Sequence, residues 1–189
     1  MRGILSLTAV FVLAIISFYV MAANNIHLPP LTAEFHQLTP EAKRQVECLA
    51  DNIYFESAHE PVDGKIAVAF VTLNRVYHDR FPDDICGVVY EKGRNVNTGK
   101  IVCQFSWYCE ERPKAISKSR HLTKTNNSLY NEIRDLALYV YLNHEEIEDP
   151  SKGALFYHAD YVSPGWRNME KTNVIGRHIF FIRKDLKST

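Results

Sequence analysis

The chain has 189 residues, which is enough for one compact domain with its own core. Hydrophobic residues make up 46% of the sequence and charged residues 23%, a composition typical of a globular protein. Lysine and arginine together number 22, as do aspartate and glutamate. The resulting net charge of zero argues against a nucleic-acid-binding protein, which usually carries a basic excess.

An apolar segment opens the chain. Arg2 is followed by an uncharged run from Gly3 to Ala23, and Val20 and Ala22 fit the pattern that precedes cleavage of a secretory signal peptide. An uncleaved anchor is the alternative, because a bilayer requires roughly 20 apolar residues. In either case we expect residues 1–23 to direct export. The proline-containing residues that follow, up to residue 40, are expected to form a linker.

Three later segments are predicted to be helices. The first begins with Thr39 as N-cap and a proline directly after it, and apolar residues recur at helical spacing as far as about Ser57. Residues 65–77 are apolar on almost every side, which is typical of a central core helix. Residues 129–143, capped by Asn127, carry a buried stripe.

The segment between the second and third helices, residues 79–112, is rich in loop-forming residues and carries three of the four cysteines. Loops with cysteines and aromatic residues suit a substrate-binding wall. An even number of cysteines in an exported chain indicates disulfides. Four cysteines allow three pairings, and we expect Cys103 to pair with Cys86 or Cys109. Four reduced, buried thiols, including Cys48, are the alternative.

Two short strands are predicted near the end of the chain, at residues 154–158 and 178–182. A connection that contains Gly, Pro, Asn and Trp166 lies between them. The sequence therefore predicts an α+β fold that is mainly α, with a small sheet, in a domain spanning residues 41–185.

Glu56 is the strongest candidate for a catalytic residue. It lies three residues after Ile53 and seven after Leu49, so a helix places its carboxylate along the apolar stripe. Apolar surroundings disfavour the charged form of a carboxyl group and so raise its pKa. A general acid that protonates a glycosidic oxygen at neutral pH needs such a raised pKa. A paired or solvated residue in a fraying last turn is the alternative. Glu60 precedes Pro61 and is interpreted as a solvated turn residue, so no second carboxylate of a hydrolase pair is evident.

Polar and aromatic residues form two groups whose amides and ring faces suit sugar rings. The alternative is that these aromatic residues fill the core. No spacing typical of metal ligands occurs, and no phosphate-binding loop, so we expect neither a metal nor a cofactor. The first group is residues 104–108, and the second comprises Tyr157, Trp166 and Asn168.

Short motifs between residues 45 and 183 occur in the order found in one known family. The matching segments are residues 49–60, 64, 67–69, 73–76, 80–82, 86–90, 103–107 with Cys109, 153–158, Trp166 and 176–180. Through these segments the chain resembles the spore-cortex-lytic, SleB-type cell wall hydrolases. It departs from the family pattern at Ser57, where an Ala-like residue is common, and at His59, in place of a small or basic residue.

The resemblance implies a mostly helical, lysozyme-like fold and cleavage of peptidoglycan glycan strands between N-acetylmuramic acid and N-acetylglucosamine. Several members are lytic transglycosylases, which leave a 1,6-anhydro end. The first glutamate of the family's Y-x-E-A-x-x-E stretch corresponds to Glu56, which would act as acid and then as base. The candidates for holding sugars or stabilising the intermediate are Asn74, Gln104, Ser106, Tyr157 and Trp166.

We therefore expect an exported, monomeric enzyme of the periplasm or cell envelope whose partner is peptidoglycan. Membrane contact is expected only through residues 3–23, and nucleic acid is not an expected partner. The origin stays open between a phage endolysin and a wall remodeller of a Gram-negative cell. The alternative functions are a true hydrolase, a peptidoglycan-binding module without catalysis, and a thiol peptidase of the wall, which needs a free cysteine.

Overall fold

A computed structural model of the chain describes residues 32–95, 98–109 and 128–186. The expected signal peptide or anchor, residues 1–23, lies outside the described residues, as does the expected cap Asn127. The compact unit begins at Thr32. Helix α2 (Thr32–Gln37) lies within the stretch expected to be a linker, so this part is helical instead of irregular. No helix among the described residues is long and apolar enough to cross a membrane.

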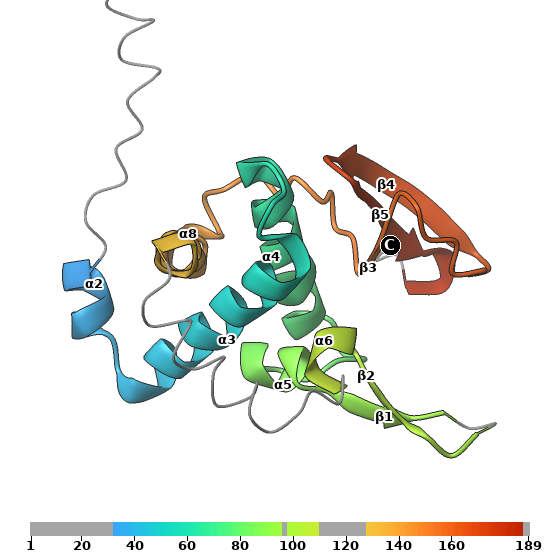
Figure 1. Cartoon of the computed structure of the whole chain (residues 1–189), viewed down its shortest axis with the longest axis horizontal. Coiled ribbons are helices and arrows are strands. Elements are labelled where there is room, and N and C mark those ends of the chain that lie inside the picture. The colour runs from blue at the N-terminus through green and yellow to red at the C-terminus, as the bar shows by residue number, and fades with distance from the viewer. Residues whose placement is uncertain (1–31, 96–97, 110–127, 187–189) are drawn as a thin grey trace, which may run out of the picture. The chain divides into compact units, whose positions relative to one another are not determined.

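Helices α3 (Pro40–Ser57), α4 (Val62–Val76) and α8 (Ser128–Asn143) form the body of the unit, and Figure 1 shows the small sheet to one side of them. All three helices were predicted, and α4 begins slightly earlier than expected. Thr39 caps α3 as predicted, because its hydroxyl oxygen accepts a hydrogen bond of 3.2 Å from the backbone N–H of Ala42.

The core forms where α3, α4 and α8 bury their apolar faces against one another. Helical spacing predicted the buried stripe of α3 correctly, and its four members have no exposed surface. Complete burial of a valine, leucine or isoleucine side chain contributes about 1.5–3 kcal/mol, so the larger members of this stripe hold α3 against the core. The stripe consists of Val46, Leu49, Ala50 and Ile53.

The segment predicted to be loop-rich contains more regular structure than expected. It includes helix α5 (Ile85–Val89), strands β1 (Lys92–Arg94) and β2 (Ile101–Cys103), and helix α6 (Ser106–Cys109). The two strands pair as an antiparallel hairpin. Each of these elements is only a few residues long, so periodicity could not identify them.

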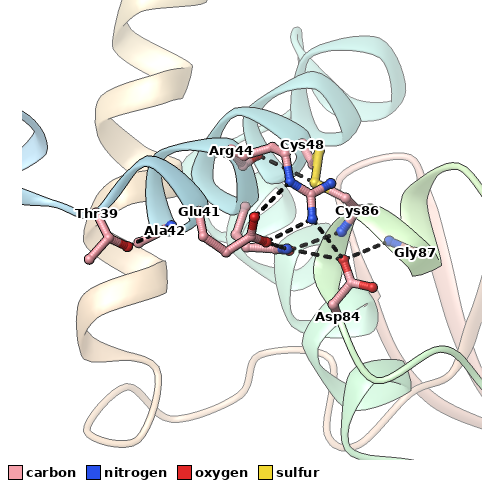
Figure 2. Close-up of polar contacts among 9 residues, drawn as sticks. Thr39, Glu41, Ala42, Arg44, Cys48, Asp84, Cys86 and Gly87 are labelled. Carbon is pink, nitrogen blue, oxygen red and sulfur yellow. Dashed lines mark hydrogen bonds and ion pairs between the residues drawn. A yellow bond between two sulfur atoms is a disulfide. The ribbon is translucent and has the colours of Figure 1, made fainter.

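Polar contacts join the beginning of α3 to the beginning of α5 (Figure 2). Arg44 Nη2 lies 2.7 Å from Glu41 Oε1 and 3.8 Å from Asp84 Oδ1. The Asp84 carboxylate in turn caps α5, accepting a hydrogen bond of 3.0 Å from the backbone N–H of Gly87. These side chains are largely exposed, so their ion pairs contribute little to stability.

Disulfides connect all four cysteines in two pairs. Cys48 of α3 pairs with Cys86 of α5, with their Cα atoms 5.2 Å apart. Cys103 pairs with Cys109, which confirms one of the two expected pairings. The other expectation, Cys86 with Cys103, is wrong because the α3–α5 contact brings Cys86 to Cys48. The alternative of four reduced thiols is also wrong.

The three-stranded sheet is antiparallel, in the order β3-β5-β4. The two predicted strands correspond to β3 (Phe156–Ala159) and β5 (His178–Arg183). The sequence did not reveal β4 (Met169–Ile175), because four polar residues in succession interrupt any alternation of apolar and polar positions. The prediction of a mainly helical α+β fold with a small sheet is confirmed.

Glu60 ties the turn after α3 to the hairpin of β4 and β5. Its Oε2 accepts a hydrogen bond of 2.9 Å from the backbone N–H of Arg177, and its backbone oxygen accepts one of 2.7 Å from Lys65 Nζ. Gly176 has a positive φ of 55°, and a Cβ there would collide with Glu60 Oε2 and lie 2.9 Å from Pro61 Cδ. The interpretation of Glu60 as a merely solvated turn residue is therefore wrong.

Candidate active site

Glu56 lies in the last turn of α3, with its side chain partly buried. The Tyr157 hydroxyl, on strand β3, donates a hydrogen bond of 3.0 Å to Glu56 Oε2. Burial raises the pKa of Tyr157 well above its ordinary value, and the neighbouring Glu56 carboxylate adds to the rise. Because the phenol stays protonated at neutral pH, it remains a hydrogen-bond donor to Glu56.

The carboxylate opens into a cavity of about 230 Å³, here called the central pocket. Four of the five residues that the sequence suggested for holding sugars line it together with Glu56. Amide, hydroxyl and aromatic groups thus surround one carboxylate, a combination that suits a sugar with polar edges and apolar ring faces. The lining residues are Glu56, Arg75, Gln104, Phe105, Ser106, Phe156, Tyr157 and Trp166.

Arg75 of α4 also lines this pocket and is only 3% exposed. Its Nε donates a hydrogen bond of 2.8 Å to the backbone oxygen of Leu155. The rings of Phe81, Phe105 and Phe156 surround the guanidinium, with their centroids 5.4, 5.2 and 5.7 Å from Cζ. Cation–π contacts and one carbonyl therefore hold this cation in place.

Burial lowers the pKa of Arg75 to about 10, against the opposing effect of the nearby carboxylates Glu91 and Glu56. The guanidinium is therefore still charged at neutral pH. The hydrogen-bonding needs of the Gln104 amide and of the Arg75 guanidinium are both met when the amide oxygen faces Arg75. In this orientation the oxygen lies 3.2 Å from both Nη1 and Nη2 of Arg75. Arg75 thus places a fixed positive charge beside Glu56 and anchors the neighbouring amide.

Two further pockets each share one residue with the central pocket. The hairpin pocket, about 450 Å³, shares Gln104 with it, and the helix-end pocket, about 460 Å³, shares Glu56 with it. Glu56 therefore lies where two pockets meet, as a residue acting on a bond inside an extended chain requires. The hairpin pocket is lined by Glu91, Gly93, Arg94, Asn95, Val102, Cys103 and Gln104, and the helix-end pocket by residues 54–59 and Leu129.

Comparison with known protein families decides the family of the chain. A family model described as Cell Wall Hydrolase matches residues 59–181. The chain belongs to this family. The matched range begins three residues after Glu56 and includes every other residue that lines the central pocket. The resemblance that the sequence motifs indicated is therefore confirmed.

The relatives of this cell wall hydrolase include named enzymes. The spore cortex-lytic enzyme of Oceanobacillus iheyensis is 28% identical over 141 residues, which are 74% of this chain and 42% of that protein. The spore cortex-lytic enzyme of Bacillus subtilis is 26% identical over 141 residues, 74% of this chain and 38% of that protein. The chain thus spans less than half the length of these relatives.

A solved structure has a similar fold. It is the catalytic domain of the germination-specific lytic transglycosylase SleB from Bacillus anthracis, with a TM-score of 0.50 and 26% sequence identity. The similarity covers 74% of this chain and 95% of that domain. The cell wall hydrolase therefore matches that domain over nearly its whole length.

The structure does not bring Asn74 to the central pocket. Its Nδ2 donates to Asp149 Oδ2 at 3.0 Å, to Ser151 Oγ at 3.3 Å and to the backbone oxygen of Ala154 at 3.1 Å. These bonds fasten α4 to the segment that leads into β3, so the role of Asn74 is structural. Asn168, in the second predicted group, has a positive φ of 59° and is not among the residues that line the pocket.

Sequence reasoning missed Arg75, Phe156 and Glu91. Arg75 is a charged residue in a helix that is otherwise apolar on nearly every side, and such a residue at a core position indicates a function or a specific partner. Glu91 was not singled out because it lies in the segment interpreted as loops.

The alternative of a thiol peptidase is wrong, because all four cysteines are in disulfides and no thiol is left as a nucleophile.

Proposed function

We propose that this cell wall hydrolase cleaves the glycan strands of peptidoglycan between N-acetylmuramic acid and N-acetylglucosamine, as a lytic transglycosylase with Glu56 as acid and base. Family membership and the similarity to a lytic transglycosylase domain support the substrate and the reaction class. The observation that carries the proposal is the position of Glu56, held by Tyr157 where two pockets meet.

The number of carboxylates in the pocket supports transglycosylation over hydrolysis. Among the described residues that line the central and helix-end pockets, Glu56 is the only Asp or Glu. Hydrolases with paired carboxylates need a second one to activate water or to form a covalent intermediate. A transglycosylase needs only one group, because the substrate supplies its own nucleophile.

In the proposed reaction, the Glu56 carboxylic acid gives its proton to the glycosidic oxygen, and the bond from that oxygen to C1 of N-acetylmuramic acid breaks. The C6 hydroxyl of the same sugar then attacks C1 and forms the new C–O bond of the 1,6-anhydro ring. Its proton goes to the Glu56 carboxylate, which restores the acid. The Tyr157 hydroxyl orients the carboxylate through both steps.

True hydrolysis is the second candidate, and Glu91 favours it. Glu91 lines the adjoining hairpin pocket, and its charge acts on the same Arg75 as that of Glu56. In this alternative Glu91 would be the second carboxylate, with the water or nucleophile role that a pair requires.

Mass spectrometry of the fragments released from purified sacculi separates these reactions. The expected fragments end in 1,6-anhydro-N-acetylmuramic acid and are one water lighter than reducing-ended fragments. Glu56→Gln is expected to release none while it retains the fold, and Glu91→Gln is expected to leave the anhydro product unchanged. Reducing-ended fragments that disappear in Glu91→Gln would favour hydrolysis. Binding to sacculi without any release would favour a binding module.

We further propose that the enzyme acts outside the cytoplasm. The apolar run after Arg2 supports export, and the two disulfides support an oxidising compartment. Fractionation of cells that express the full chain tests this, with recovery in the periplasm or envelope as the expected outcome. Recovery in the cytoplasm with four free thiols would contradict it.

A further inference from the structure

Gln104 occupies a particular position in the site, because it lines both the central pocket and the hairpin pocket. Its backbone N–H donates a hydrogen bond of 3.0 Å to the backbone oxygen of Glu91, at the base of the β1–β2 hairpin. The Cys103–Cys109 disulfide begins at the preceding residue. The backbone of Gln104 is therefore held on two sides.

The Gln104 amide is held as well. Its oxygen accepts from both terminal nitrogens of Arg75 at 3.2 Å, and Arg75 is fixed by the backbone oxygen of Leu155 and by three aromatic rings. A buried guanidinium that stays charged cannot accept a hydrogen bond. The amide oxygen must therefore face Arg75, and the amide N–H₂ group must point away from it.

This orientation decides what Gln104 can recognise. With its oxygen committed to Arg75, the side chain offers only N–H donors, so its ligand partner must be a hydrogen-bond acceptor. The strongest neutral acceptor on the glycan of peptidoglycan is the carbonyl oxygen of the acetamido group. The aromatic rings of Phe105 and Phe156, which line the same pocket, suit the methyl group next to that carbonyl.

We propose that Gln104 is a specificity-determining residue that donates its amide N–H to the acetamido carbonyl of a sugar at the junction of the central and hairpin pockets. Arg75 acts as a positioning residue, because it fixes the orientation of the amide. This inference rests on the proposed function in that it takes a glycan as the ligand. It adds the group on the sugar that is recognised and the residue that recognises it.

Binding measurements test the inference without requiring catalysis. Chitotetraose and cellotetraose are both neutral, and they differ in having an acetamido group or a hydroxyl at C2. In Glu56→Gln protein, isothermal titration calorimetry is expected to show chitotetraose bound about ten-fold more tightly, the effect of one such hydrogen bond. Gln104→Glu keeps oxygens for Arg75 but removes the N–H donors, so the preference should fall to about two-fold or less.

The matched control is Gln37→Glu, which makes the same chemical change on the exposed end of α2. It is expected to keep the full preference for chitotetraose. Arg75→Lys, which retains the charge but loses the planar fork, should weaken the preference while its thermal unfolding shows that the protein is folded. The inference would be overturned if Glu56→Gln protein bound the two sugars equally tightly. It would also be overturned if the preference for chitotetraose persisted after Gln104→Glu was added.

Failure of this inference is distinguishable from failure of the proposed function. Release of anhydro fragments from sacculi by the protein with Glu56 intact establishes cleavage whatever the role of Gln104. Conversely, a preference for chitotetraose that depends on Gln104 would stand even if the sacculi were not cleaved.

Discussion

The hydroxyl of Tyr157 donates a hydrogen bond of 3.0 Å to Oε2 of Glu56, across 101 positions of sequence. It joins the end of a helix to an outer strand of the sheet, so the acid of the proposed reaction depends on how these two elements are held together. The contacts described above can be tested by substitutions that leave Glu56 in place.

Tyr157→Phe should lower activity without unfolding the protein. The substitution removes only the hydroxyl that orients the Glu56 carboxylate, and the ring keeps its contact with Phe180. We expect kcat for release of fragments from sacculi to fall roughly 10-fold, on the scale of one misplaced catalytic group, with KM little changed. A roughly 10-fold rise in KM with kcat unchanged would mean that Tyr157 binds sugar instead of orienting the acid.

Removing the two disulfides should have unequal effects on stability. Cys48 and Cys86 are 38 positions apart, whereas Cys103 and Cys109 are 6 apart. Because a disulfide restricts the unfolded chain more when it closes a longer loop, replacing the first pair by serine should cost about 4 kcal/mol and the second about 2 kcal/mol. Guanidinium unfolding of the two double variants measures this, and equal losses would contradict the loop-length argument.

Gly176→Ala should destabilise the hairpin that Glu60 holds. A Cβ at this positive φ is strained and would also collide with Glu60 Oε2, so we expect a loss of about 1–3 kcal/mol in the free energy of unfolding. The loss should be smaller in a Glu60→Ala background, where the colliding atom is gone. Gly93→Ala is the control, since a Cβ at Gly93 meets nothing within 4 Å.

Stability should decrease as the pH falls because of His178, which is 7% exposed on β5. Burial lowers the pKa of His178 below 6.5, although Glu60 and Asp160 oppose the effect. The unfolded chain therefore takes up a proton near pH 6.5 that the folded protein does not, and the free energy of unfolding falls below that pH.

Urea unfolding at pH 7.5 and 5.5 measures this dependence. Each unit by which the pKa is lowered corresponds to about 1.4 kcal/mol at the acid end. His178→Gln cannot titrate, so its stability should change less than that of the parent between the two pH values. The same change in both proteins would exclude His178 as the cause.

Much of the fold could be predicted from local patterns. The helices were recognisable because apolar residues such as Leu49 and Ile53 recur at helical spacing, and Thr39 marks a start. Strand β4 was not, because its polar residues do not alternate with apolar ones and its pairing partner is set by the hairpin. The partner of Cys86 depends on the packing of α5 against α3, which is a tertiary contact.

The site was predictable only in part, because tertiary contacts decide which side chains reach the central pocket. Glu56 stood out through its spacing and its motif, and Gln104, Ser106, Tyr157 and Trp166 through their chemistry. Asn74 belonged to an equally suggestive motif, but its amide is used for bonds within the fold. Sequence chemistry shows which groups can bind a sugar, whereas only the tertiary structure shows which of them remain available to do so.

The link between Glu60 and the backbone of Arg177 affects how a mutational scan of this protein would be interpreted. Substitutions at Gly176 or Glu60 would shift the turn that follows Glu56 and reduce turnover, although neither residue lines the central pocket. Ranked by lost activity alone, they would be mistaken for sugar-binding positions. Screening for folded protein alongside activity would separate residues that hold the acid in place from those that contact the glycan.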